Sequence, residues 1–456
     1  MSICYSGLSG RVKGQSVTIS VSKAHPLITL AQVIPWQAIA EMVIPDLKKT
    51  TKKGCLHLGR RLTLRIHLGA FLLQMLYDMT DRETEYDIED NAAARIFCGY
   101  GSVDRWNCPD HTKIEEFRNR LDSETKRQIA NSFAALAVDL GFADPRDVDI
   151  DSTVQEANIS YPSDSVLMKK LAKKSYNILE WLKKEGSESF QNVKIDLKNI
   201  ISKAKEYYFT AKNTVIEKKR EIFRDLHKEV KKQIYPVLEL LEKLDSKTLQ
   251  KMPWNIRKIT DQIVSNGKRY LLDVAHFIRY HTMKPGKILS WHAQEVCCIK
   301  KGKVGKEVEF GRVYQLARIG GNLLFVGKCT SIRMEDAASV LPMIQEHSGL
   351  FKDVKIDSMC TDKSYFSYAN MAHITDIKNA CLGFQMEDME DELFAALRDR
   401  RSGLEALIGH AKHGGQLGKS RMKSDETTLG AGYTAIGGFN LRQIIRHQKG
   451  KIRNSA

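Results

Sequence analysis

Residues 145–164, PRDVDIDSTVQEANISYPSD, form the stretch that decides the fold. Two apolar residues, Val148 and Ile150, alternate in it with three aspartates. This alternation predicts a β-strand with one apolar and one acidic face, because successive side chains of a strand point to opposite sides. The three aspartates then share the acidic face.

Further strands are predicted beyond this segment. Residues 307–319 and 322–330 both have strand composition, and Gly320-Gly321-Asn322 between them is typical of a hairpin turn. Residues 353–367, DVKIDSMCTDKSYFS, predict a strand that runs into a loop, and residues 401–412, RSGLEALIGHAK, predict a helix. Since strands and helices interleave, we expect a mixed α/β domain.

Short helices are predicted on the N-terminal side, between residues 25 and 121. One of them has apolar residues at helical spacing that would form a buried face: Leu64, Leu68, Phe71, Leu72 and Met75. Thr112 and Glu115 have the spacing of a capping box, which predicts that another helix begins there. Residues 123–141 predict one more helix.

A long helical, lysine-rich segment interrupts the sheet between residues 165 and 283. Apolar residues recur in it every seven positions, at Ile216, Phe223, Val230, Val237 and Leu244. This pattern predicts a helical hairpin or a coiled-coil-like insertion. We interpret Asp164, which precedes it, as the N-cap of the helix that starts near Ser165.

The 456 residues exceed what one hydrophobic core usually organises, so several units are expected. We predict a helical N-terminal domain, the first part of a mixed-sheet domain, the helical insertion, and the second part of the sheet domain. These occupy residues 1–121, 122–164, 165–283 and 284–456, respectively.

The charge balance favours a polyanionic partner. Lys and Arg number 71 against 55 acidic residues, which gives a formal net charge of +16. The basic runs at residues 48–54 and 59–65 could contact phosphates or form an ordinary solvated surface. Nine cysteines without a CxxC pair indicate neither a disulfide framework nor a zinc knuckle. With no signal peptide and no run of about 18 apolar residues, we expect a cytoplasmic protein without membrane partners.

Three acidic residues are candidates for metal-dependent chemistry: Asp151 at the end of the first strand, Asp362 at the end of a later strand, and Glu405 on the helix predicted at residues 401–412. Phosphodiester cleavage by two divalent ions needs clustered carboxylates, because Mg²⁺ prefers oxygen ligands. Asp149 has the same strand parity as Asp151, so the alternation does not distinguish them. Spacing alone would fit surface acids and helix caps equally well.

The sequences that flank these three acids favour a role as metal ligands. Asp151 is followed by Ser-Thr, Asp362 lies in TDKSY, and Glu405 lies in RRSGLEALIGHAKHGGQLGKSRMKSD, which precedes GFNLRQI. With the N-terminal runs HPLITLAQVIPWQAI, LLQMLYDMTDRETEYDIEDN and PDHTKIEEFRNRL, these stretches resemble bacterial insertion-sequence transposases of the DDE class. The catalytic domain of that group has a ribonuclease-H-like fold.

The segment around Glu405 also resembles a signature of related transposases in its spacing Arg401, Glu405, Lys412. A tyrosine usually stands three residues before the arginine, where this chain has Arg398. The neighbouring His410 and His413 are interpreted as phosphate contacts or plain surface.

The resemblance implies a ribonuclease-H-like mixed α/β domain in which Asp151, Asp362 and Glu405 hold two Mg²⁺ ions, for which Mn²⁺ can substitute. Arg401 and Lys412 would bind DNA phosphates. The partners would be terminal inverted repeats and target DNA, bound by at least a homodimer associated with the nucleoid. The helical domain of residues 1–121 would be the DNA-binding domain. The alternatives are a non-catalytic DNA-binding protein derived from a transposase, and a host nuclease with the same metal chemistry.

Overall fold

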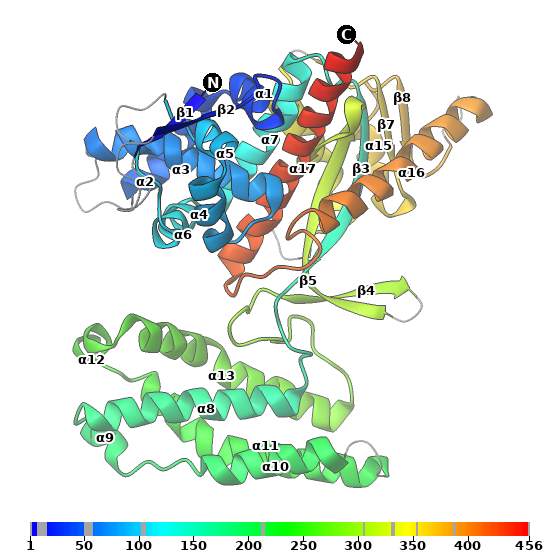
Figure 1. Cartoon of the computed structure of the whole chain (residues 1–456). Coiled ribbons are helices and arrows are strands. Elements are labelled where there is room, and N and C mark those ends of the chain that lie inside the picture. The colour runs from blue at the N-terminus through cyan, green and yellow to red at the C-terminus, as the bar shows by residue number, and fades with distance from the viewer. Residues whose placement is uncertain are drawn as a thin grey trace. The chain divides into compact units, whose positions relative to one another are not determined.

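The computed structural model describes residues 2–6, 16–49, 58–101, 106–210, 215–303, 306–329, 333–352, 354–385 and 389–454. The chain forms two compact units, which are labelled by element in Figure 1. Unit 1 comprises residues 1–158 and 298–456, and unit 2 comprises residues 159–297. The predicted insertion lies within unit 2. The predicted boundary at residue 121 lies inside unit 1, where the helices before and after it share one core.

A mixed sheet organises unit 1 around β3 (Asp147–Glu156). The strand order is β4-β5-β3-β7-β8, and β6 pairs with β5. β3 is antiparallel to β5 and parallel to β7, which is parallel to β8. The other strands are β4 (Cys297–Lys303), β5 (Lys306–Ile319), β6 (Leu323–Val326), β7 (Ser358–Thr361) and β8 (Asn379–Leu382).

The predicted strand around Val148 and Ile150 is confirmed, but its predicted end at Asp151 is wrong. β3 continues to Glu156, because its second half pairs along the length of β5. Gly311 permits this pairing, since a Cβ there would lie only 1.9 Å from the Gln155 carbonyl oxygen.

The predicted hairpin between β5 and β6 is confirmed. Its turn is the short 3-10 helix η1 (Gly320–Asn322), in which Gly321 and Asn322 have φ angles of +79° and +63°. Glycine and asparagine tolerate this left-handed conformation better than other residues do, which explains the turn composition.

The sheet separates two apolar cores. Val148, Ile150 and Ala317 on one face pack with α7 (Ser123–Asp139), α14 (Asp336–Leu350) and the N-terminal helices. On the other face, Tyr314 and Leu316 pack with α16 (Asp391–His413) and α17 (Asp425–Asn454). Asp151 is the register partner of Leu316, so the acidic side of β3 faces α16. A short 3-10 turn, η2 (Lys363–Tyr365), and α15 (Tyr368–His373) complete this part.

Short helices form the N-terminal part of unit 1, as predicted: α1 (Pro26–Val33), α2 (Trp36–Lys49), α3 (Leu58–Tyr77), α4 (Asp81–Asp90), α5 (Ala92–Phe97) and α6 (His111–Arg120). The predicted apolar face of α3 is buried or half-buried. The predicted capping box at Thr112 is wrong: the N-cap is Asp110, two residues earlier, and its carboxylate accepts from the Lys113 amide. A pair of strands, β1 (Ser2–Ser6) and β2 (Ser16–Ser20), was not predicted.

Most side chains of the two basic runs, residues 48–54 and 59–65, are not described in the structure. Residues 50–54 of the first run lie outside the described residues, and so do the side chains of residues 59–63 of the second.

Within the described part of the chain, no single helix is long and apolar enough to cross a membrane. The consecutive helices α1 and α2 reach that length only as a pair, with a 73° bend between them.

Unit 2 is a helical bundle with a core of its own. Its helices are α8 (Asp164–Lys184), α9 (Glu188–Gln191), α10 (Leu197–Thr210), α11 (Ile216–Leu241), α12 (Ser246–Lys251) and α13 (Trp254–Tyr280). The heptad positions Phe223, Val230 and Val237 are buried on α11, whereas Ile216 is exposed. The predicted hairpin is therefore too simple, because α11 packs against α8, α10 and α13.

The predicted N-cap role of Asp164 is also wrong. Ser163 is the N-cap residue, and Asp164 is the first residue of α8. Its carboxylate instead pairs with the Lys287 ammonium at 2.6 Å and accepts from the Tyr270 hydroxyl at 3.3 Å. A buried carboxylate with a cationic partner explains this position better than a cap does.

Candidate active site

The acidic face of β3 is held against α16 by arginines. The Arg400 guanidinium contacts both carboxylate oxygens of Asp149, at 2.8 to 3.0 Å, and Arg318 donates to the same group at 3.2 Å. Arg400 also pairs with Asp147 at 3.0 Å. The Asp149 side chain is 2% exposed and burial raises its pKa, against the opposing effect of Arg400. Asp149 therefore has two cationic partners and almost no access to solvent.

Asp151, one strand repeat farther on, is in a different setting. Its side chain is 16% exposed, and its carboxylate accepts from the Ser152 amide at 2.7 Å and from Arg401 at 3.3 Å. Burial raises the pKa of Asp151 to about 6, and the negative charges of Asp362 and Glu405 add to the rise. The charges of Asp362 and Glu405 thus both act on Asp151.

Arg401 connects Asp151 with Glu405. The guanidinium contacts the Asp151 carboxylate through one nitrogen and the Glu405 carboxylate, at 3.5 Å, through the other. Arg401 and Glu405 are four residues apart on α16 and so lie on the same side of that helix. Because one guanidinium reaches both acids, they lie on the same face of the sheet. The Glu405 side chain is 67% exposed and is free to turn toward solvent.

Asp362 follows directly after β7, as predicted. Its carboxylate accepts from the Ser364 amide at 2.7 Å and thereby caps the turn η2. The Ser364 hydroxyl lies within hydrogen-bond distance of Asp362 and also of Asp336, at 2.7 Å. A hydroxyl has one proton, so it can serve only one of the two carboxylates at a time. A second acid, which the sequence did not predict, therefore lies beside Asp362.

A polar chain fixes the position of Asp336. The Tyr365 hydroxyl donates to Gln315 at 2.7 Å, and the Gln315 amide donates to Asp336 at 2.9 Å. Burial raises the pKa of Tyr365, and the charges of Asp336, Asp151 and Asp362 raise it further. Through these two hydrogen bonds, Tyr365 connects η2 with β5 and α14.

The remaining predicted residues are spread along α16. Lys412 is half-buried in its last turn, roughly 16 Å along the helix axis from Arg401 at 1.5 Å per residue. One phosphate group therefore cannot contact both residues. Arg398, which replaces the usual tyrosine, is exposed and lies over the Phe394 ring. His410 and His413 are both exposed near the end of the helix.

The arrangement has the donor chemistry of a Mg²⁺ site without its final geometry. In the described residues, no three His, Cys, Asp or Glu side chains are grouped so that they could hold a metal ion. Arg401 explains part of this absence of a grouped ligand set, because its guanidinium forms ion pairs with Asp151 and Glu405, two of the carboxylates that would otherwise be available to a cation. The donors themselves are carboxylate oxygens, which hard divalent cations prefer.

Three charged residues of the site were not predicted from the sequence: Arg318, Arg400 and Asp336. Two adjacent arginines of the helix, Arg400 and Arg401, contact two alternate aspartates of the strand, Asp149 and Asp151. An arginine pair on the helix and an aspartate pair on the strand are both visible in the sequence, and matching them could have identified Arg400. Asp336 had no comparable signal. It is an acid in the first turn of a helix, which is common for electrostatic reasons alone.

Comparison with known proteins supports a transposase-related function. Residues 15–120 match the family model described as a transposase domain (DUF772). The match covers β2 and helices α1 to α6 and ends before the sheet that carries the acids. Searches of curated proteins and of solved structures gave no match.

Proposed function

We propose that the protein is a DDE transposase whose unit 1 contains a ribonuclease-H-like catalytic domain with Asp151, Asp362 and Glu405 as its three acids. The observation that carries the proposal is the arrangement around Arg401, which contacts Asp151 and Glu405 while the charge of Asp362 acts on Asp151. The sheet gives further support, since β3 is central and the strand that ends before Asp362 lies beside it in parallel.

Mg²⁺ fits the donor set, and Mn²⁺ can replace it. Bound metal would polarise the scissile phosphate and favour ionisation of the attacking water or 3′-OH. The chain's own contribution would be to supply Asp151, Asp362 and Glu405 as ligands and to place Arg401 next to two of them, Asp151 and Glu405. With Asp151 and Glu405 serving as metal ligands, the Arg401 guanidinium would be available to bind a DNA phosphate. Lys412 would bind a separate phosphate farther along the DNA.

Terminal inverted repeats are the proposed DNA partner, bound mainly through residues 1–121. Support comes from the transposase-domain match over residues 15–120 and from the net charge of +16. Target DNA would enter for strand transfer. Since two DNA ends must be paired in that reaction, we propose at least a homodimer during catalysis.

The test is a cleavage assay with DNA that carries the sequences flanking the gene. The wild-type protein should nick this DNA only with Mg²⁺ or Mn²⁺. Asp151→Asn, Asp362→Asn and Glu405→Gln should each reduce the rate by at least a hundredfold and leave gel-shift affinity within about threefold, since a lost metal ligand affects the transition state more than binding. Asp399→Asn, an exposed acid on α16, is the matched control.

The outcomes separate the alternatives. Near-normal cleavage by any of the three variants removes that residue from the site. Specific binding of the flanking DNA without cleavage by the wild type would indicate a non-catalytic derivative. Cleavage of any DNA regardless of the flanking sequences would indicate a nuclease.

A further inference from the structure

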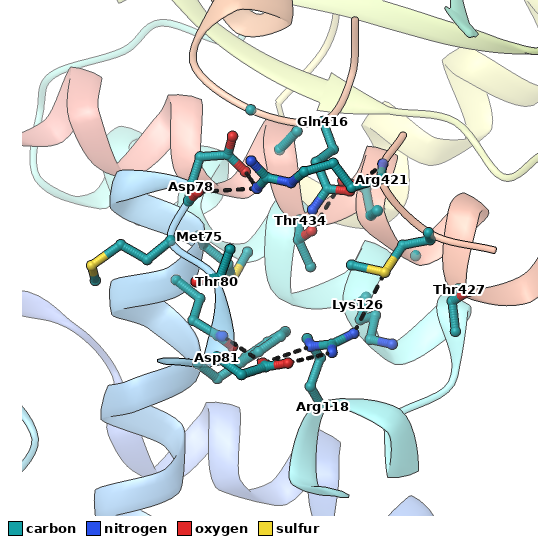
Figure 2. Close-up of a pocket in the computed structure, with 18 residues that line it drawn as sticks. Met75, Asp78, Thr80, Asp81, Arg118, Lys126, Gln416, Arg421, Thr427 and Thr434 are labelled. Carbon is teal, nitrogen blue, oxygen red and sulfur yellow. Dashed lines mark hydrogen bonds and ion pairs between the residues drawn. The ribbon is translucent and has the colours of Figure 1, made fainter. Parts of the chain in front are cut away.

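A pocket of about 260 Å³ lies within unit 1, apart from the three acids (Figure 2). Residues from α3, α4, α6, α7 and α17 line it, together with the loop between α3 and α4 and the loop that precedes α17. Phe71, Met75 and Ala431 contribute apolar surface. The charged residues of the lining are three basic and two acidic: Arg118, Lys126, Arg421, Asp78 and Asp81.

Both acids of the pocket are already neutralised. Asp78 pairs with Arg421 at 2.6 Å, and Asp81 pairs with Arg118 at 2.9 Å. Figure 2 shows these contacts as dashed lines and draws none to Lys126. The pocket therefore has one excess positive charge, and it belongs to Lys126.

Lys126 is 6% exposed, and in the part of the chain that the structure describes its ammonium has no hydrogen-bond or ion-pair partner. Its stem packs against Gly430, where a Cβ would come within 2.8 Å of the lysine Cδ. Burial, together with the positive charge of Arg118, lowers its pKa to about 8, while the charges of Glu426, Asp122 and Asp46 act in the opposite direction. The ammonium remains mostly protonated at pH 7. The residue is largely buried, but its Nζ atom keeps some access to the pocket. A cation that is poorly hydrated and has no protein partner at the wall of a pocket points to an anionic ligand.

We propose that this pocket binds a nucleotide through its phosphate group, which pairs with the Lys126 ammonium. A phosphate supplies the missing negative charge and several acceptor oxygens. The volume exceeds that of a phosphate alone, and Phe71 and Met75 offer apolar contact to the attached sugar or base. The nucleotide could be free or part of a DNA strand. The site is independent of the three acids, so it does not depend on the proposed catalytic activity.

The test uses calorimetric titration of the full-length protein with deoxyadenosine 5′-monophosphate. Saturable binding is expected, with deoxyadenosine at least tenfold weaker because it lacks the phosphate. Lys126→Met should weaken binding of the monophosphate about tenfold or more, whereas Lys113→Met, an exposed lysine on α6, should leave it unchanged. Equal affinity of the nucleoside, or unchanged affinity of Lys126→Met, would overturn the proposal.

Thermal unfolding without ligand tests whether Lys126 has a structural role. Methionine keeps the packing of the stem and removes the unpaired charge, so Lys126→Met should have a Tm equal to or above that of the wild type. A clear fall in Tm would mean that the ammonium has a structural partner, which would contradict the proposal. Displacement of the bound nucleotide by a short DNA duplex would identify DNA as the source, and persistence of the nucleotide would identify a free nucleotide.

Discussion

Asp149 and Asp151 share one face of β3 but have different partners. Asp149 is enclosed by Arg400 and Arg318, whereas Asp151 shares Arg401 with the exposed Glu405. The alternation of the sequence predicts that both point the same way, but it carries no information on which arginine meets which aspartate. That distinction depends on how α16 packs on the sheet, and it leaves Asp151 as the acid available to a cation.

At the residue scale, Asp149→Asn should destabilise the fold. Removing this carboxylate takes the buried counter-charge from Arg318 and leaves Arg400 only the half-exposed Asp147, at a cost on the order of 3 kcal/mol. Asp151→Asn should lower the free energy of unfolding much less, because burial already disfavours the charged form of Asp151. Arg401 also still has Glu405 as an ion-pair partner in that variant. Denaturant unfolding of both variants measures the difference, and equal losses would refute the separation of roles.

At the element scale, the turn that presents Asp362 depends on close packing with the end of β8. Gly383 has φ of +74°, and a Cβ there would lie 2.4 Å from the Lys363 amide nitrogen. The sequence predicted the strand before Asp362 and the helix around Glu405 correctly, because each has a clear local pattern. It did not predict this contact, or the extension of β3 past Asp151, because both arise from pairing between distant segments.

Gly383→Ala should therefore displace the Asp362 turn. We expect metal-dependent cleavage to fall at least tenfold and the free energy of unfolding to fall by about 1–3 kcal/mol, since alanine is strained at this φ and meets backbone. DNA affinity should stay within about threefold. The control is Gly403→Ala on α16, where a Cβ meets nothing within 4 Å and should slightly stabilise the helix. Wild-type cleavage by Gly383→Ala would show that the turn does not position a catalytic group.

At the scale of the whole molecule, the acids of unit 1 come from segments separated in sequence by the helical bundle of unit 2. The heptad spacing predicted helices in that interval but not a bundle, because periodicity in one helix does not specify how many partners it has. Unit 2 has its own core, which explains how so long an insertion is compatible with continuous pairing of β3 and β5. The central claim is that Asp151, Asp362 and Glu405 share bound metal despite this separation.

Iron-directed backbone cleavage tests that claim most directly. Fe²⁺ replaces Mg²⁺ in the full-length protein, and ascorbate with peroxide then generates radicals that cut the chain close to the bound ion. The account predicts cuts near residues 151, 362 and 405 in the same sample, suppressed by excess Mg²⁺ and lost in Asp151→Asn. Cuts confined to other segments, or an unchanged pattern in Asp151→Asn, would contradict it.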